Sequence, residues 1–144
     1  MIDDLDLLAM AGPEDQAAFK RDVRRIKKEN TEMFQEFAGY LVNHDFEGDS
    51  IKSCVANMDV YLNHFLVYFD PADATEVQDG LTLVDEFFEE WLPEQNDNIT
   101  TTVADFLESI GLFYKWLSEE TGVIDESDFE AFVEFINYRK DSWL

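Results

Sequence analysis

The chain has 144 residues, of which 46% are hydrophobic, and its 33 acidic and ten basic side chains give a net charge of −23. This is the length of one ordinary domain, and thirteen phenylalanines supply a core that disordered chains lack. A protein this acidic repels phosphate nearly everywhere except along one helical stripe.

The remaining composition points to a reducing compartment. Cys54 is the single cysteine, so an internal disulfide is excluded. Residues 1–6 contain no basic side chain, unlike a secretory signal, and no apolar run is long enough to cross a bilayer. We therefore expect a cytoplasmic protein that does not enter a membrane.

Two parts are predicted along the chain: an acidic N-terminal tail over residues 1–12 and a single helical domain over residues 13–144. Ile2, Leu5 and Leu8 form one apolar edge of the tail, which we expect to dock on the core.

The first helix is predicted to begin at Pro13, a residue that suits a first helical turn. Steps of three and four residues then separate its apolar positions, which are Phe19, Val23, Ile26, Met33, Phe37 and Tyr40. Only Asn30 interrupts this series. We favour one long helix ending before Gly48 over a second helix capped near Thr31.

Two further helices are predicted before Pro93. Asp49 or Ser50 caps one of them, and its stripe is Ile51, Val55, Met58, Leu62, Phe65 and Phe69. Asp73 and Glu76 form a capping pair for the other, whose stripe is Val77, Leu81, Val84, Phe88 and Trp91. The polar loop at residues 93–99 is predicted to be the most mobile segment.

The last two helices follow this loop. One of Thr100, Thr101 and Thr102 caps the fourth helix, and Gly122 ends it; its stripe is Val103, Phe106, Ile110, Phe113 and Leu117. Ser127 and Glu130 form a second capping pair, and the fifth helix reaches toward Trp143 on Phe129, Phe132 and Ile136. Since no segment alternates with a period of two, we predict an all-α, single-domain bundle of about five helices.

The residue types needed for catalysis or for a bound metal or cofactor are not assembled in the sequence. His44 and His64 lack the glutamate three positions earlier that a di-metal bundle uses, and Cys54 forms no nucleophile pair with a histidine. The six glycines form no phosphate-binding loop. We therefore predict a protein that is not an enzyme and holds neither a metal nor a cofactor.

Six of the ten basic residues cluster in the first helix. We call this set the cationic ridge: Lys20, Arg21, Arg24, Arg25, Lys27 and Lys28. A helix places them opposite Phe19, Val23 and Ile26. The ridge is the predicted partner-binding site, but we favour the simpler alternative that it pairs with carboxylates of the protein itself or of another copy.

Part of the sequence resembles known proteins. Residues 57–63, 87–91, 109–117 and 140–143 are similar to a family of small, uncharacterised acidic bacterial helical proteins. Ser50, Ile51, Thr102 and residues 113–117 also resemble the SAM-like core-binding domain of tyrosine recombinases, the phage integrase N-terminal domain. That resemblance implies a shared helical fold and a DNA-clamping role. From Ser50 onward, however, the chain holds four bases, so we transfer no binding residue.

Three functions remain in order of preference. The first is a non-enzymatic protein–protein interaction module whose partner has a basic surface or is a second copy. The second is a DNA mimic, or a DNA-related regulator that shares the recombinase fold. The third is direct nucleic-acid binding through residues 20–28, which the charge of the remaining chain opposes.

Overall fold

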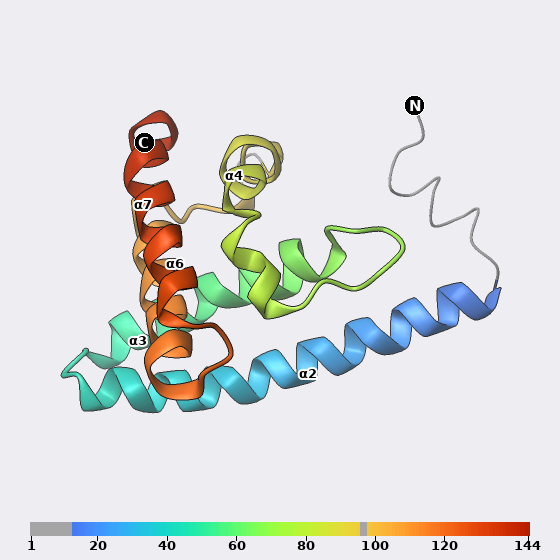
Figure 1. The fold of residues 1–144 in the computed structure, drawn as a ribbon, viewed down its shortest axis with the longest axis horizontal. Helices are drawn as coiled ribbons and strands as arrows, with labels where there is room; N and C mark the ends of the chain where they lie inside the picture. Colours follow the sequence, from blue (N-terminus) through green and yellow to red (C-terminus); the bar gives the residue numbers. More distant parts are fainter. Residues whose placement is uncertain (1–12, 96–97) are drawn as a thin grey trace.

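The computed structural model describes residues 13–95 and 98–144, and every regular element in these ranges is helical (Figure 1). The prediction of an all-α bundle is therefore confirmed. The predicted tail at residues 1–12, with its docking, lies outside the described residues, as does part of the loop at 93–99. No helix in the described ranges is both long and apolar enough to cross a membrane.

The first helix, α2 (Pro13–Asn43), is continuous through Asn30 and ends before Gly48, as the preferred interpretation of the sequence predicts. Asn30 is itself buried, and its Nδ2 donates a 2.8 Å hydrogen bond to Oδ1 of Asn63. A satisfied buried amide does not interrupt a helix. The buried stripe continues through Asn30 to Phe34, Phe37 and Leu41.

The second helical rod returns along α2 and changes pitch twice. It consists of α3 (Gly48–Asp59), the π turn η1 (Val60–Phe65) and the 3-10 turn η2 (Leu66–Tyr68). Its N-cap is Glu47, which makes no side-chain capping bond, so the predicted cap at Asp49 or Ser50 is wrong. Both residues lie inside the first turn of α3 instead.

The predicted third helix is wrong as a single element. It is divided into the 3-10 turn η3 (Val77–Leu81), α4 (Val84–Glu86), the π turn η4 (Phe87–Trp91) and α5 (Leu92–Glu94). The predicted capping pair is also wrong, because Glu76 precedes η3 without a capping bond and the Asp73 amide donates to Asp70. Pro93 lies within α5, which continues directly from η4, so the predicted end of this helix before Pro93 is wrong.

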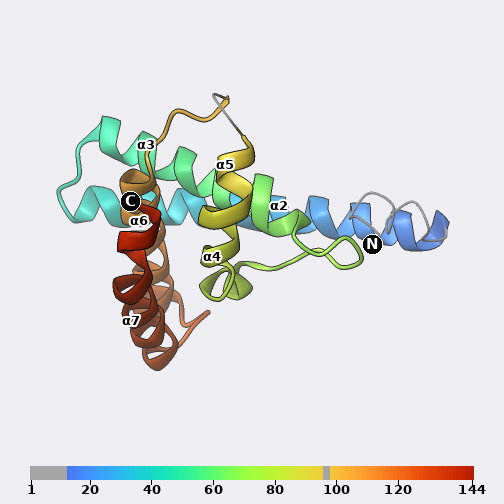
Figure 2. The ribbon, with the colours of Figure 1, turned by 90° about the horizontal axis from the view of Figure 1, so that it is seen from above.

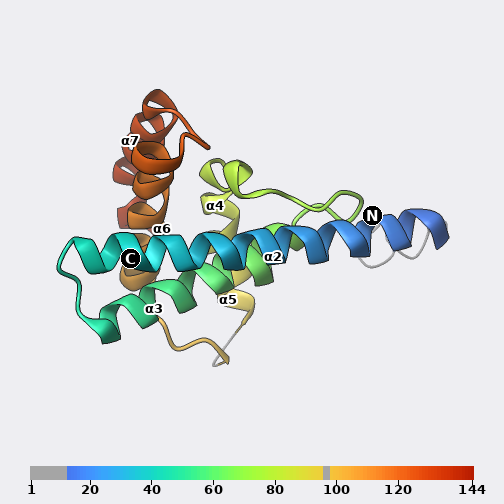
Figure 3. The same ribbon diagram turned by 90° about the horizontal axis from the view of Figure 1, so that it is seen from below.

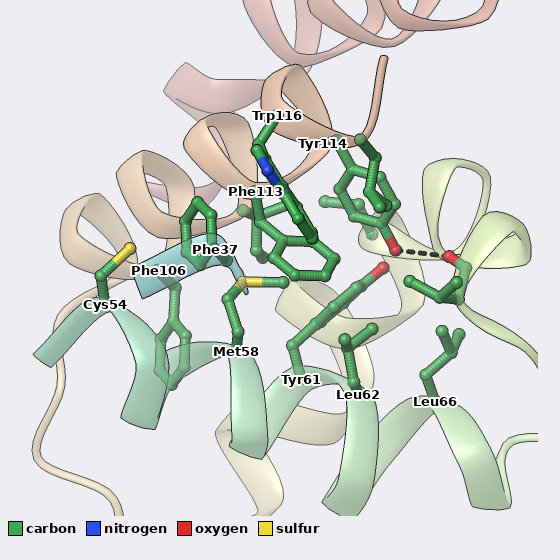
Figure 4. Close-up of a cluster of buried hydrophobic side chains, with 14 of the residues drawn as sticks. Phe37, Cys54, Met58, Tyr61, Leu62, Leu66, Phe106, Phe113, Tyr114 and Trp116 are labelled. Carbon is green, nitrogen blue, oxygen red and sulfur yellow. Dashed lines mark hydrogen bonds between the residues drawn. The ribbon is translucent and has the colours of Figure 1, made fainter. Parts of the chain in front are cut away.

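Two buried tyrosines bind carbonyl oxygens of η3. The Tyr61 hydroxyl donates a 2.6 Å hydrogen bond to the Gly80 carbonyl. The Tyr114 hydroxyl, whose bond is the dashed line in Figure 4, donates one of 2.7 Å to the Val77 carbonyl. A Cβ atom at residue 80 would collide with the Tyr114 hydroxyl. Burial raises the pKa of both hydroxyls well above its usual value, so both stay protonated donors.

The fourth helix matches its predicted range, whereas the fifth begins before its predicted cap. In α6 (Val103–Trp116), Thr102 is the N-cap and accepts a 3.1 Å bond from the Asp105 amide. The π turn η6 (Leu117–Thr121) follows and ends at Gly122, whose φ of 70° is the predicted left-handed conformation. In α7 (Glu126–Trp143) the N-cap is Asp125, so the predicted cap at Ser127 is wrong.

The helices form two packing regions. Figures 1 and 2 show α6 and α7 side by side, crossing α2 steeply near its C-terminal half, whereas the N-terminal half of α2 extends past them. Around the C-terminal half lies an aromatic core in which the Phe37 and Phe113 rings are 5.1 Å apart (Figure 4). The N-terminal half buries Phe19, Val23 and Ile26 in a second, smaller cluster with Val67 and Ala74.

Candidate functional site

All six side chains of the cationic ridge lie on the N-terminal half of α2, as the sequence predicts. Five of them are exposed and Lys27 is half-buried. The helix produces this placement because Phe19, Val23 and Ile26 point into the smaller cluster, so the intervening positions point outward. Figure 3 shows the outer side of α2 in front of every other helix.

Arg25 is bound by the protein itself. Its Nη1 lies 3.2 Å from Oε1 of Glu29, one turn later, and 3.4 Å from Oε1 of Glu76 in the loop beyond η2. These hydrogen bonds raise the pKa of the Arg25 guanidinium, which is charged in any case. Arg25 therefore joins α2 to that loop and is not free for a partner.

Lys27 is held in a similar way. Its Nζ donates a 2.7 Å hydrogen bond to the Tyr68 hydroxyl and lies 4.7 Å from the centre of the same ring. The contact adds a cation–π attraction to the hydrogen bond and fixes the end of η2 against α2. Lys27 is thus the second ridge cation with an internal role.

The other four ridge cations have no ion pair with any carboxylate in residues 15–95 and 98–144. They are Lys20, Arg21, Arg24 and Lys28. Pairing within the protein, one form of the interpretation that the sequence favoured, is therefore seen for Arg25 and not for these four, and pairing with another copy stays a prediction. These four form a cationic strip that is exposed to solvent.

The C-terminal half of the same outer face has the opposite sign. Glu32 and Glu36 are exposed, follow the last ridge cation by one and two turns, and likewise form no ion pair with a described residue. The outer face of α2 is thus polarised along its length, from cationic to anionic. Sequence analysis singled out the cations and missed these two acids, whose four-residue spacing was the available signal.

A polar cleft of about 510 Å³ is lined mainly by residues of α3 and α6. Asn57 Nδ2 donates a 3.0 Å hydrogen bond to Ser109 Oγ in its wall, and Asp49, Asp105 and Glu108 lie around it. Burial raises the pKa of the Cys54 thiol beside them, which keeps the sulfur in its less nucleophilic form. Every polar group named here has a hydrogen-bond partner or reaches solvent, so the cleft has no evident ligand.

A second groove, of about 610 Å³, lies between η3 and α7 and is mostly apolar. Ile124 and Phe132 form its buried part, and the exposed Val123 and Phe135 form its edge. The fifth-helix stripe predicted Phe132 as core but gave no signal for Phe135. Exposed aromatics on α7 also include Tyr138, which is 82% accessible.

Trp91 and Trp143 pack against the core. The Trp143 ring stacks on Phe88 with centroids 4.9 Å apart, and Trp91 stacks on Phe87 at 5.4 Å. Each is only partly exposed. Neither offers a free aromatic surface of the kind that dominates many interfaces.

Neither histidine lines the polar cleft or the apolar groove. His44 Nδ1 is 2.8 Å from the Tyr40 carbonyl, and His64 Nε2 is 3.4 Å from Asp59 on the exposed side of η1. Within the described ranges, no three His, Cys, Asp or Glu side chains are grouped closely enough to hold a metal ion.

No protein-family model, no curated protein and no solved structure matches this chain. The two family resemblances therefore stay predictions.

Proposed function

We propose that this protein works without catalysis, by binding another protein through the cationic ridge of α2. The observation that carries the proposal is the set of four exposed ridge cations without a carboxylate partner in the described chain. In a protein with 33 acidic side chains, an internal counter-charge is readily available for most cations. A cationic strip without an internal partner is suited to bind a counter-charge on another molecule.

The surrounding charge specifies the partner further. A partner that fits presents an acidic strip to the ridge and basic residues to the acids beside it, because like charges facing each other are strongly unfavourable. A nucleic acid offers phosphates without that basic border. Its approach is opposed by the net charge of −23.

The test compares two triple variants that change the net charge equally. One reverses the ridge with Arg21→Glu, Arg24→Glu and Lys28→Glu, and the control reverses Lys52, Lys115 and Lys140, which are exposed on other helices. Each protein is immobilised and used to capture proteins from the native host at low and at high salt. We expect the wild type and the control to retain a common, salt-sensitive protein that the ridge variant loses.

Equal retention by the ridge variant would contradict the proposal. A gel-shift assay with the same three proteins covers the competing function. If only the ridge variant failed to shift DNA or RNA, direct nucleic-acid binding would replace protein binding as the function.

A further inference from the structure

We infer that the ridge binds a second copy of this chain, through antiparallel pairing of the two α2 helices. The inference rests on the proposed function, since it names the partner of the same surface. Its starting point is the polarity of the outer face of α2. Arg24 and Lys28 are cationic, and Glu32 and Glu36, one turn apart in the same way, are anionic.

The geometry allows two such faces to meet. α2 has 31 residues, so it is about 46 Å long. In Figures 1 and 3 no other described helix lies on its outer side. The face is also flat toward its C-terminal end, since Gly39 is exposed and a Cβ atom there would contact nothing within 4 Å.

The spacing of the charges sets the register. An antiparallel pair centred at Asn30 places Arg24 opposite Glu36 of the second copy, and Lys28 opposite Glu32 of the second copy. Twofold symmetry repeats both contacts, so about four ion pairs form and no like charges meet among these residues. Arg21 then faces Gly39 of the second copy, where there is room for a long side chain.

Other arrangements fit less well. A parallel pair in register places like charges against each other. A parallel pair shifted by two turns places the cations of one copy against the acids of the other. It leaves the remaining charges of each copy unpaired, so further copies can add without limit to form an open filament. The antiparallel pair closes on itself and uses all four charges of each copy.

The interface is mostly polar and small, so we expect a weak dimer. The two copies also repel each other through their net charge of −23. That repulsion acts over long distances and is screened at about 0.15 M salt, where the Debye length is about 8 Å, whereas paired groups in contact are closer than that. Dimerisation is therefore expected to be strongest at intermediate salt and to be lost near 1 M.

The test is a charge swap followed by analytical ultracentrifugation of the purified full chain, at protein concentrations up to about 1 mM. One variant carries Arg24→Glu and Lys28→Glu, and the other carries Glu32→Lys and Glu36→Lys. Each alone faces like charges in a homodimer, so we expect its self-association to weaken at least about tenfold. An equimolar mixture of the two matches every charge again and is expected to form a heterodimer.

A fourth protein carries all four substitutions and keeps the wild-type net charge. It is expected to recover the homodimer, which a general effect of charge or of folding would not produce. Circular dichroism checks that each variant remains helical.

A wild type that stays monomeric at every salt and concentration would overturn the inference, as would a dimer indifferent to the swaps. The capture experiment above separates these results from the proposed function. A monomer that still retains a ridge-dependent partner contradicts only the homodimer, whereas loss of both contradicts the proposed function too.

Discussion

The two halves of α2 differ in what holds them, although they belong to one continuous helix. The C-terminal half packs Phe34, Phe37 and Leu41 into an aromatic core that includes α6 and α7. The N-terminal half is covered by Val67 and Ala74, in a cluster of four buried side chains among the described residues. We therefore expect the C-terminal half of α2 to be the more stable of the two. The half that carries the ridge is expected to open more readily.

The largest expected effect comes from truncating one phenylalanine in each half. Phe37 is fully buried between Phe113 and Trp116, so Phe37→Ala should lower the free energy of unfolding by about 3–5 kcal/mol. Phe19 lies in the smaller cluster, and Phe19→Ala should cost about half as much. Urea unfolding followed by circular dichroism measures both, and equal losses would remove the contrast between the halves.

Alkaline pH should weaken the core through Tyr61 and Tyr114. Burial holds the pKa of Tyr61 and Tyr114 far above 10.0 in the folded protein. The contribution of each tyrosine to the free energy of unfolding is complete below about pH 10. It is lost above that pH at about 1.4 kcal/mol per pH unit, because tyrosine ionises first in the unfolded chain. Urea unfolding at pH 9, 10 and 11 measures the loss.

The control for this pH effect is the double variant Tyr61→Phe and Tyr114→Phe. It should be less stable at neutral pH, because two buried hydrogen bonds are removed, but its stability should decline less steeply above about pH 10. Tyrosinate absorbance from either residue while the protein is still folded would contradict the expectation.

Asn30 marks the junction between the two halves, and removing its amide should have an intermediate effect. Asn30→Ala leaves the buried Asn63 Oδ1 without its donor, at a cost of about 1–3 kcal/mol. Asn63 still donates to Asp59, so the fold should survive. Hydrogen exchange should then show faster exchange in residues 13–29 than in residues 34–43. Uniform acceleration would mean that α2 opens as one unit.

The smallest effect is expected from the two ridge cations that hold the protein's own loops. Arg25→Gln removes the contact with Glu76, and Tyr68→Phe removes the hydrogen bond to Lys27. Both sites are exposed, so the unfolding midpoint should hardly move. Limited proteolysis should nevertheless cut residues 69–76 faster, with Lys52→Gln as a control elsewhere on the surface. Unchanged cleavage would show that Val67 and Ala74 suffice to hold the loop.

Periodicity predicted most of the fold because the helices bury one face each. The spacing of Val103, Phe106, Ile110 and Phe113 follows the helical repeat, and Thr102 and Gly122 lie where a cap and a stop are needed. After Ile26, the predicted apolar stripe of α2 is one residue early at two positions. It contains Met33 and Tyr40, whereas the structure buries Phe34 and Leu41. Asn30 had been counted as an interruption, although it belongs to the buried face.

The remaining errors have tertiary causes. The η3 segment is bound by hydroxyls from Tyr61 and Tyr114, which come from other helices and leave no local pattern. The cap at Asp125 was missed because Ser127 and Glu130 have the more familiar spacing. The ridge could be located from the sequence, but not its internal partners. Glu76 is 51 residues from Arg25, and Tyr68 is 41 residues from Lys27.

The three widened turns, η1, η4 and η6, have a consequence for length variation in this chain. A π turn contains one residue more than the α-helical turn it replaces. Deleting one residue from an ordinary helix rotates everything after it by about 100°. Deleting His64, Glu90 or Glu119, each exposed within such a turn, instead restores regular pitch and keeps the following side chains in phase. Single-codon losses should therefore be tolerated at these three places and nowhere else along the same rods.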